Sequence, residues 1–329
     1  MISPDMNTRA RIATVCQNRR GGASADEQRQ KMMELLREAL KARPDLVCLP
    51  ETFTLTHVTD PEVATEPVDG PTVTAAARLA KEGNCYVICP QMTRRDGQYR
   101  NSAVMIGRRG EIVGIYDKRQ PVTSTYDYTK MEDGMMPGQG DGVFDLDFGR
   151  IGVRICFDIG FPDDWKMLKD KDVRLVVWSS AYNGGFPLQA YASMHEYYVV
   201  SSVRTESSRI IDPCGTVLSR TDGTEPIIWR DINLDFLVAH TDFNYGIPGR
   251  IEKAYGSRVA VRRYADEGVL LIEPADPAVR TDALKKELGL ESRREYLCRH
   301  QVAYEQLLAG KMPVPQVAGH GNRPMYSAD

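Results

Sequence analysis

Short apolar segments with the period of strands alternate with amphipathic segments with the period of helices along the first two thirds of the chain. Residues 11–16 and 45–50 have the pattern of strands. Between them, Ser24 and Glu27 form a capping-box sequence that predicts the start of a helix, which ends before Pro44. A helix over 71–82 and a strand over 86–90 repeat this order. Since such helices bury one face against a sheet, the alternation predicts a layered α/β fold.

The same alternation continues in the middle of the chain and then loosens. Strands are expected at residues 102–106, 112–116, 144–146, 151–155, 175–178 and 198–203, and helices at 163–169 and 188–195. After residue 231 only two strands, at 258–262 and 269–273, and a helix at 293–308 are expected. We therefore expect an N-terminal tail at 1–9, one main domain at 10–275 and a C-terminal extension at 276–329. The extension is expected to pack on the domain or on a partner subunit.

The charge balance excludes several classes of partner. The chain has 42 Lys and Arg residues against 45 Asp and Glu residues, a formal net charge of -3, with both signs interspersed. Neither nucleic acid nor an anionic membrane is an expected partner of such a surface. No apolar run approaches the roughly 20 residues that span a bilayer, and the first residues lack the apolar core of a signal peptide. A cytoplasmic location is expected.

The cysteines and histidines do not have the spacing of a metal site. Seven cysteines, an odd number, are scattered along the chain, which predicts free thiols. Cys85 and Cys89 form the one close pair, and no histidine or second pair completes a zinc site around them. Both are expected to be buried packing residues. The five histidines are isolated in sequence, so no metal is expected.

Three reactive side chains follow directly after segments with the pattern of buried strands. Glu51 follows the strand at 45–50, Lys118 follows the strand at 112–116 and Cys156 follows the strand at 151–155. In open α/β sheets, ligands bind beyond the carboxyl ends of the strands. The three side chains could therefore meet in one site.

A thiol and a carboxylate need help to exchange a proton. Their ordinary pKa values, about 8.5 and about 4.3, differ by roughly four pH units, or nearly 6 kcal/mol. Burial raises the pKa of a carboxyl group, and a nearby ammonium lowers that of a thiol. We therefore expect that enclosure of Glu51 and a position of Lys118 beside Cys156 bring the two pKa values together. The same lysine could stabilise a developing oxyanion.

An ordered set of motifs surrounds these residues and resembles the nitrilase superfamily, the carbon-nitrogen hydrolases. The motifs are LPETF at 49–53, YDK at 116–118, RIGVRICFD at 150–158 and FP at 161–162. DGP at 69–71, NS at 101–102 and Glu132 before PG at 137–138 fit the same pattern. The resemblance covers roughly residues 11–262, which identifies the main domain as a carbon-nitrogen hydrolase domain.

The resemblance implies an αββα sandwich whose subunits pair into αββα-αββα dimers, so a homodimer or a higher homo-oligomer is expected. It assigns Glu51 as general base and Cys156 as the nucleophile that becomes acylated. Lys118 and the backbone N–H of Phe157 would stabilise the oxyanion, and Glu132 would position the lysine and assist proton transfer. The reaction it implies passes through a thioester that water then hydrolyses.

Residues after the cysteine narrow the choice among branches of the superfamily. True nitrilases usually have Trp-Glu-Asn after the cysteine, whereas this chain has Phe157 and Asp158, which is similar to the amidase and carbamoylase branches. Hydrolysis of a small-molecule amide or N-carbamoyl bond is therefore favoured over that of a nitrile. Relatives that act on N-carbamoyl-D-amino acids have arginines where this chain has Ile159 and Gly160. A substrate carboxylate, if there is one, must be bound elsewhere.

Further substrate contacts and alternative functions remain open. The loop at residues 179–185 could line the site, with Tyr182 and Asn183 as contacts, or it could be an ordinary turn. Met194 and His195 stand where many relatives have Glu-Asn, which leaves the subfamily open. Transfer of the acyl group to an amine would use the same acyl-enzyme as hydrolysis. A catalytically silent binding protein is a further alternative, although such a protein would be expected to lose one of the reactive residues.

Overall fold

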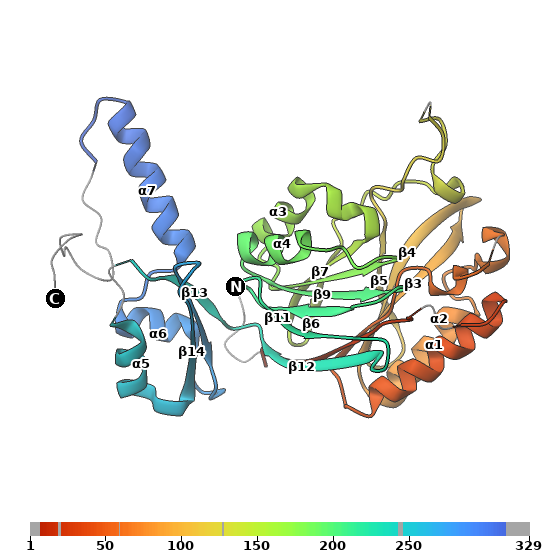
Figure 1. Cartoon of the computed structure of the whole chain (residues 1–329), viewed down its shortest axis with the longest axis horizontal. Coiled ribbons are helices and arrows are strands. Elements are labelled where there is room, and N and C mark those ends of the chain that lie inside the picture. Colours follow the sequence, from red (N-terminus) through yellow and green to blue (C-terminus); the bar gives the residue numbers. More distant parts are fainter. Residues whose placement is uncertain (1–6, 19–20, 59, 127, 243–245, 314–329) are drawn as a thin grey trace. The chain divides into compact units, whose positions relative to one another are not determined.

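The computed structural model describes residues 7–18, 21–58, 60–126, 128–242 and 246–313 (Figure 1). The chain divides into two compact units, Met1–Leu234 and Asp235–Asp329, and each is described by itself. This division falls earlier in the chain than the boundary expected at residue 275. Residues 1–6 of the expected tail and residues 314–329 of the expected extension lie outside the described residues.

Unit 1 contains a first six-stranded sheet with the order β12-β1-β2-β3-β4-β5. The β1, β2 and β3 strands are parallel, whereas β4 is antiparallel to both β3 and β5. The β5 strand therefore runs in the same direction as β2. The bounds of the strands are Arg9–Val15 for β1, Leu46–Cys48 for β2, Tyr86–Arg95 for β3, Gln98–Ile106 for β4, Ile112–Asp117 for β5 and Ile227–Asn233 for β12.

A second six-stranded sheet of unit 1 has the order β11-β10-β9-β8-β7-β6. Its central strands β7, β8 and β9 are parallel, and every residue of β8 and β9 is buried. Strands covered on both faces are rich in apolar residues, as in the apolar first halves of β8 and β9. The bounds are Val143–Leu146 for β6, Gly149–Ile155 for β7, Leu175–Ser180 for β8, Tyr198–Val203 for β9, Arg209–Ile211 for β10 and Val217–Arg220 for β11.

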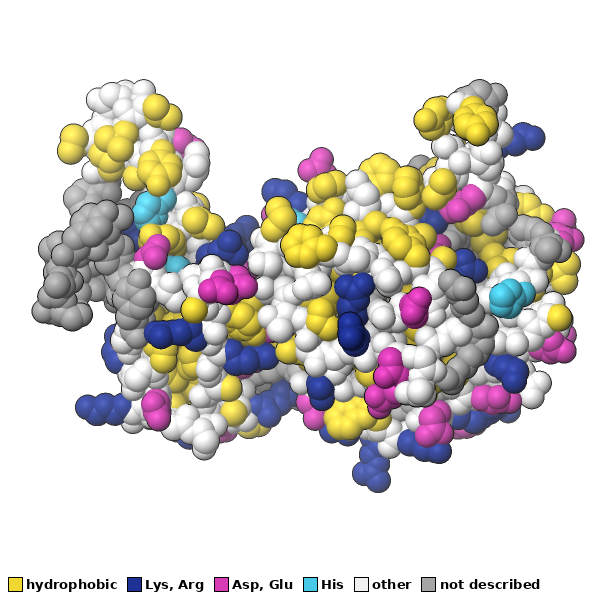
Figure 2. All heavy atoms as spheres, viewed as in Figure 1, with side chains coloured by type: hydrophobic (Ala, Val, Ile, Leu, Met, Phe, Trp, Pro, Cys, Tyr) yellow, Lys and Arg dark blue, Asp and Glu magenta, His cyan; other side chains and the backbone are white. Residues whose placement is uncertain are grey.

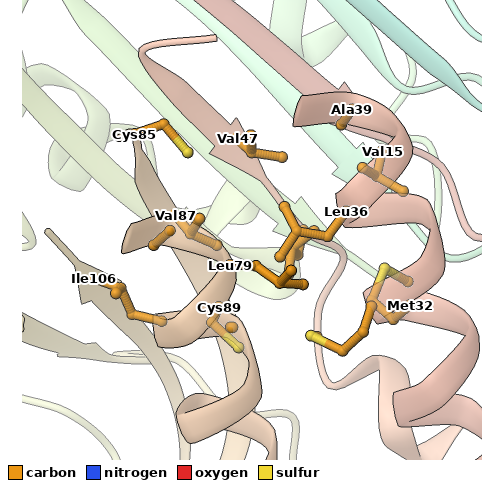
Figure 3. Close-up of a cluster of buried hydrophobic side chains, with 14 of the residues drawn as sticks. Val15, Met32, Leu36, Ala39, Val47, Leu79, Cys85, Val87, Cys89 and Ile106 are labelled. Atoms are coloured by element: carbon orange, nitrogen blue, oxygen red, sulfur yellow. The ribbon is translucent and has the colours of Figure 1, made fainter. Parts of the chain in front are cut away.

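Two helices cover the outer face of the first sheet. They are α1 (Ala25–Leu40) and α2 (Pro71–Gly83), whose buried faces carry Met32, Leu36 and Leu79. These side chains pack on strand residues such as Val47 and Val87, and Cys85 and Cys89 lie in the same core, fully buried as expected (Figure 3). The Ser24 hydroxyl accepts a hydrogen bond from Glu27 N, so the predicted start of the helix is confirmed. The Glu27 carboxylate accepts from Ala23 N and not from Ser24 N, so the capping box differs from the usual one by one residue.

Two further helices, α3 (Pro162–Asp170) and α4 (Pro187–His195), cover the outer face of the second sheet. Trp165 of α3 stacks on Tyr191 of α4 with ring centroids 4.5 Å apart. Short 3-10 helices lie in the connections of unit 1: η1 (Phe53–Leu55), η2 (Pro61–Ala64), η3 (Glu132–Gly134) and η4 (Cys156–Gly160). The order of layers is therefore helices, sheet, sheet, helices, the αββα sandwich that the sequence predicted.

Hydroxyl groups join the inner faces of the two sheets. Thr14 Oγ1 of β1 donates to Ser201 O of β9 at 2.7 Å. Ser202 Oγ lies 2.7 Å from Val15 O and 3.0 Å from Cys48 O, and Ser179 Oγ donates to Leu49 O at 2.9 Å. The carbonyls of Val15, Cys48 and Leu49 lie at the ends of β1 and β2 or directly after them. The bonds to these carbonyls therefore align the carboxyl ends of strands from both sheets.

Unit 2 is a three-stranded sheet with the order β13-β15-β14 and three helices. Its own core includes Ile251, Leu270, Ile272 and Leu284. The sequence predicted β14, β15 and α7 but not β13, α5 or α6. The bounds are Leu237–His240 for β13, Ile247–Tyr255 for α5, Gly256–Arg258 for η5, Val259–Tyr264 for β14, Val269–Pro274 for β15, Thr281–Leu288 for α6 and Arg293–Leu308 for α7.

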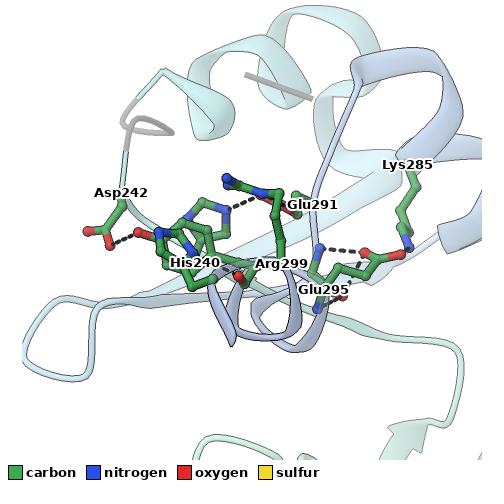
Figure 4. Close-up of polar contacts among 9 residues, drawn as sticks. His240, Asp242, Lys285, Glu291, Glu295 and Arg299 are labelled. Atoms are coloured by element: carbon green, nitrogen blue, oxygen red, sulfur yellow. Dashed lines mark hydrogen bonds and ion pairs between the residues drawn. The ribbon is translucent and has the colours of Figure 1, made fainter. Parts of the chain in front are cut away.

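A polar cluster joins β13 to α7 in unit 2 (Figure 4). Glu291 accepts from Arg299 Nε at 3.0 Å and lies 3.2 Å from His240 Nε2. Tyr296 stacks on His240 with centroids 3.8 Å apart and donates to Asp242 at 2.8 Å. These bonds connect the end of β13 to the first turns of α7.

Several large hydrophobic side chains remain exposed in unit 1. Phe161, Phe186 and Met194 lie on the face of the second sheet that carries α3 and α4, where Figure 2 shows hydrophobic side chains gathered. The expected pairing of two copies stays a prediction. No helix among the described residues is long and apolar enough to cross a bilayer.

Candidate active site

The predicted reactive residues lie at one edge of the first sheet and the facing edge of the second. Glu51 follows β2, and Lys118 follows β5, which runs in the same direction. Cys156 follows β7 of the second sheet and opens η4. The carboxyl ends of these strands converge, so the structure brings together the three residues that the sequence selected.

Lys118 is the centre of this group. Its Nζ donates to Glu132 Oε1 at 2.7 Å and to Glu51 Oε1 at 3.2 Å. The side chain is 2% exposed, which alone would lower its pKa, but Glu51, Cys156 and Glu132 together raise the pKa above its ordinary value. Lys118 is therefore a buried ammonium held between two carboxylates. Glu132 also accepts from Val122 N at 3.3 Å, which fixes its own position.

Asn101 of β4 supports both Glu51 and Lys118. Its side-chain Nδ2 donates to Glu51 Oε1 at 2.8 Å, and its backbone carbonyl accepts from Lys118 N at 2.8 Å. Both bonds of Glu51 go to Oε1. Within the described residues, the buried Oε2 atom of Glu51 has no hydrogen-bond partner. One carboxylate oxygen is thus held in place while the other is available to accept a proton.

Cys156 has a backbone conformation that few residues adopt. Its φ is +45°, in the left-handed region, which places the residue on a sharp turn between β7 and η4. Trp178 Nε1 donates to the Cys156 carbonyl at 3.0 Å and holds this turn. The Ser180 side chain and the Ala181 N–H both act to lower the pKa of the thiol, but less than burial raises it. The residue itself is half-buried, so the sulfur is positioned without being sealed off.

The protonation states at rest differ from those expected from the sequence. Burial raises the pKa of the Cys156 thiol to about 12; Glu51 adds to this, and Lys118 only partly opposes it. Burial alone would raise the pKa of Glu51, but Lys118, Arg204 and Asn101 hold it below its ordinary value. The prediction that the two pKa values converge is therefore wrong for the free protein. The thiol is protonated and Glu51 is ionised, so proton transfer must accompany attack of the sulfur on a carbon atom.

Asp158 connects the cysteine turn with the lysine segment. Its Oδ2 accepts from Tyr116 Oη at 2.7 Å and from Ile155 N at 2.9 Å, and its Oδ1 accepts from Gln120 N at 3.0 Å. Tyr116 and Gln120 flank Lys118, whereas Ile155 precedes Cys156. One fully buried carboxylate therefore sets the spacing between the two reactive groups.

The three predicted substrate contacts have different surroundings. Phe157 is the second residue of η4, where backbone N–H groups have no acceptor within the helix, and a bond from its N–H to an oxyanion stays a prediction. The Tyr182 ring packs edge-on against Trp178, 5.5 Å between centroids, and Cys156 and Glu51 both raise its pKa, although burial raises it most. Asn183 is exposed, and its Oδ1 accepts a hydrogen bond from Gly185 N at 3.1 Å. Such a bond is typical of an ordinary turn, which is the alternative to a substrate contact. A substrate contact of Asn183 stays a prediction.

Sequence reasoning missed Asn101, Ser180 and Arg204 as parts of the site. Asn101 and Ser180 occur in segments that were recognised, but a strand residue gives no local signal that its side chain faces a carboxylate or a thiol. Arg204 directly follows β9, and the position at the end of a buried strand is the signal that could have selected it. The described residues contain no group of three or more His, Cys, Asp or Glu side chains that could hold a metal ion.

Comparison with known proteins found a matching family profile, related sequences and solved structures with a similar fold. A sequence profile described as carbon-nitrogen hydrolase matches residues 12–239. Omega-amidase NIT2 of Mus musculus is 26% identical over 226 residues, which cover 61% of this chain and 80% of that protein.

Among solved structures, Saccharomyces cerevisiae Nit3, a member of branch 10 of the nitrilase superfamily, has a TM-score of 0.60 at 17% identity and covers 78% of this chain and 97% of its own. A second solved structure is that of an amidase of Nesterenkonia sp. AN1 with the acetamide moiety of fluoroacetamide added covalently at its active-site cysteine. It has a TM-score of 0.59 at 16% identity, and the match covers 71% of this chain and 94% of that one.

Proposed function

The chain belongs to the carbon-nitrogen hydrolase family, and from that premise we propose that it hydrolyses a linear, non-peptide amide or N-carbamoyl bond of a small molecule. Cys156 is the nucleophile, Glu51 the general base and Lys118 the donor to the oxyanion. Glu132 holds Lys118. No cofactor takes part in this reaction. We also propose that the site works in a homodimer or a higher homo-oligomer in the cytoplasm.

One observation carries this proposal: Glu51 uses only Oε1 for its bonds to Lys118 and Asn101 and keeps a buried, unpartnered Oε2. A carboxylate with a purely structural role at this depth would have both oxygens bonded, because an unsatisfied buried acceptor is costly. An oxygen held without a partner beside a protonated thiol is suited to receive the thiol proton.

In the first half-reaction, the Cys156 sulfur attacks the amide carbonyl carbon while the thiol proton passes to Glu51 Oε2. The carbonyl oxygen becomes an oxyanion, which accepts hydrogen bonds from Lys118 Nζ and the Phe157 N–H. The C–N bond then breaks, and the amine or ammonia leaves with the proton from Glu51. A thioester of Cys156 and the acyl group remains.

In the second half-reaction, water attacks the thioester carbon and gives a proton to Glu51. The C–S bond breaks, the sulfur recovers the proton, and the carboxylic or carbamic acid leaves. Lys118 remains an ammonium throughout, because Glu51 and Glu132 raise its pKa. Its charge is therefore present in both transition states without a proton transfer of its own.

The test is release of ammonia or amine from a panel of primary amides, N-carbamoyl compounds and nitriles. Wild-type protein is expected to act on amides or N-carbamoyl compounds, and Cys156→Ala is expected to lose activity by about 1,000-fold or more. Cys298→Ala, which removes an exposed cysteine of unit 2, is the matched control and is expected to retain activity. Mass spectrometry of wild-type protein quenched in acid during turnover should find the acyl group on Cys156.

Three results would contradict the proposal. Activity that survives in Cys156→Ala would exclude the proposed nucleophile. Activity on nitriles alone would move the chain to the nitrile-hydrolysing alternative. Preferential formation of hydroxamates when hydroxylamine is added, with little free acid in its absence, would identify an acyltransferase.

A further inference from the structure

Arg204 places a positive charge beside the proposed base. It directly follows β9, and its backbone N–H donates to Ser180 O at 3.0 Å. Ser180 is the last residue of β8, the parallel neighbour of β7, whose carboxyl end carries Cys156. The guanidinium is close enough to Glu51 for its charge to lower the pKa of that carboxylate, next in effect to Lys118 among the neighbouring charges. Arg204 is therefore part of the same constellation as Glu51 and Cys156.

Among the described residues, Arg204 differs from Lys118 in its partners. Lys118 lies between Glu51 and Glu132, so its ammonium is already neutralised. In the ranges that the structure describes, the Arg204 guanidinium forms neither an ion pair nor a hydrogen bond, although the residue is half-buried. A half-buried guanidinium with five unused donors is well suited to a carboxylate.

Nearby arginines behave differently. Arg209 donates to the carbonyls of Asn183 and Gly185, and buried Arg154 donates to the carbonyls of Asp141, Val153 and Asp164. These two side chains hold the backbone around the site in place. The Arg204 side chain has no comparable bond to any residue that the structure describes, so its position at the site needs a different explanation.

We propose that Arg204 binds a carboxylate of the substrate, separate from the amide or carbamoyl group that is cleaved. This inference rests on the proposed function and names the substrate class as amides that carry a second, negatively charged group. Arginine binds such a group with two parallel hydrogen bonds, which fixes the orientation of the substrate as well as its position. Ile159 and Gly160, the positions at which the carbamoylase-like pattern has arginines, carry no charge here.

Binding at Arg204 has a consequence for Glu51. In the free protein the positive charge of Arg204 makes Glu51 a weaker base. A bound carboxylate offsets that charge, so the pKa of Glu51 rises in the complex and its basicity increases when the correct substrate is present. The acid limb of kcat should then lie at higher pH than that of kcat/KM for a charged substrate, and the two limbs should coincide for a neutral one.

The experiment compares glutaramate with pentanamide, a neutral amide of the same chain length. The variants are Arg204→Gln, Arg204→Lys and, as a matched loss of surface charge, Arg109→Gln in the exposed turn between β4 and β5. We expect Arg204→Gln to lower kcat/KM for glutaramate by about 10- to 100-fold, mainly through KM, and to have a clearly smaller effect on kcat/KM for pentanamide. Arg204→Lys should recover part of the loss, and Arg109→Gln should resemble the wild type.

Equal use of the two amides by the wild type, or equal losses for both in Arg204→Gln, would overturn the role of Arg204 while Cys156-dependent hydrolysis stands. If neither amide is hydrolysed, the proposed function loses its support. The role of Arg204 is then tested by a binding measurement that does not depend on hydrolysis. Isothermal titration of the Cys156→Ala protein with glutarate should then show binding that Arg204→Gln abolishes. Absence of that binding would overturn the inference.

Discussion

The side-chain nitrogen of Asn101 lies 2.8 Å from Oε1 of Glu51, and the carbonyl of the same asparagine accepts a hydrogen bond from the backbone N–H of Lys118. One residue of β4 therefore fixes the proposed base and the proposed oxyanion donor relative to each other. Both contacts are buried, so neither is weakened by competition with bulk water.

Substitution Asn101→Ala should change the pH dependence of activity. The hydrogen bond from Asn101 helps to keep the pKa of Glu51 low, so its loss raises that pKa and moves the acid limb of kcat/KM to higher pH. We expect kcat to fall by about 10- to 100-fold, since a buried bond to a charged group is lost. Steady-state kinetics as a function of pH measures both effects.

Gln91→Ala is the matched control for Asn101→Ala. Gln91 of β3 is an equally buried amide, but it bonds to Ala64 O and Thr54 and not to Glu51. The Gln91→Ala variant should be less stable than the wild type, but the acid limb of its kcat/KM should lie at the same pH. An acid limb that shifts equally in both variants would show that general loosening, and not the bond to Glu51, is responsible.

The free thiol of Cys156 should stay protonated at neutral pH. Since burial raises its pKa to about 12, the difference in thiolate absorbance between wild type and Cys156→Ala should be negligible up to about pH 9. The pKa of Glu51 is lowered, so kcat/KM should nevertheless be flat across neutral pH, because the base is already ionised. A thiolate signal that titrates near neutral pH would contradict this assignment of protonation states.

Gly184→Ala should disturb the turn of Cys156 through Trp178. Gly184 has φ +70°, and an added Cβ would lie 2.7 Å from the ring of Trp178, which donates to the Cys156 carbonyl. We expect a loss of stability of about 2 to 4 kcal/mol, from the left-handed backbone and the overlap together. Displacement of the indole should also lower kcat by about tenfold.

Gly97→Ala separates the two causes. Gly97 has nearly the same backbone conformation, with φ +73°, and no atom within 4 Å of an added Cβ. Gly97→Ala should lower the free energy of unfolding by about 1 to 2 kcal/mol and leave kcat unchanged. Denaturant unfolding and kinetics of the two variants side by side give the comparison; equal kcat values would exclude the steric route through Trp178.

Glu291→Gln should weaken unit 2 in a pH-dependent way. Burial opposes ionisation of Glu291, but Arg299 and His240 hold its pKa below the ordinary value. A carboxylate with a lowered pKa stabilises the fold above its unfolded pKa of about 4.3, and this contribution is lost as the pH falls through the folded pKa.

Hydrogen exchange of β13 and β15 should therefore be faster in Glu291→Gln by an amount that corresponds to about 1 to 3 kcal/mol near neutral pH. The difference from the wild type should shrink below about pH 4. Glu305→Gln, an exposed substitution on α7, is the control and should have little effect. A difference that does not depend on pH would contradict an ionic origin.

Local patterns in the sequence predicted most elements of unit 1 because their periodicity is strong. The strand before Glu51 is a short apolar segment, apolar residues alternate along the strand before Cys156, and helix α1 has a clear apolar face. Unit 2 was predicted less completely. The short strand β13 and the short helices α5 and α6 contain too few residues to show a clear period. The strand that pairs with β13 is β15, which is not its neighbour in sequence.

The sequence by itself determined the layered fold and the places of Glu51, Lys118 and Cys156 at the ends of strands, because these depend on local periodicity and on motifs in a set order. Only the tertiary structure decided how Asn101 and Arg204 act on Glu51, and in which direction the pKa values of Glu51 and Cys156 move. Burial and charges contributed by segments far apart in the chain are summed at one point in space, and their balance has no counterpart in any single stretch of residues.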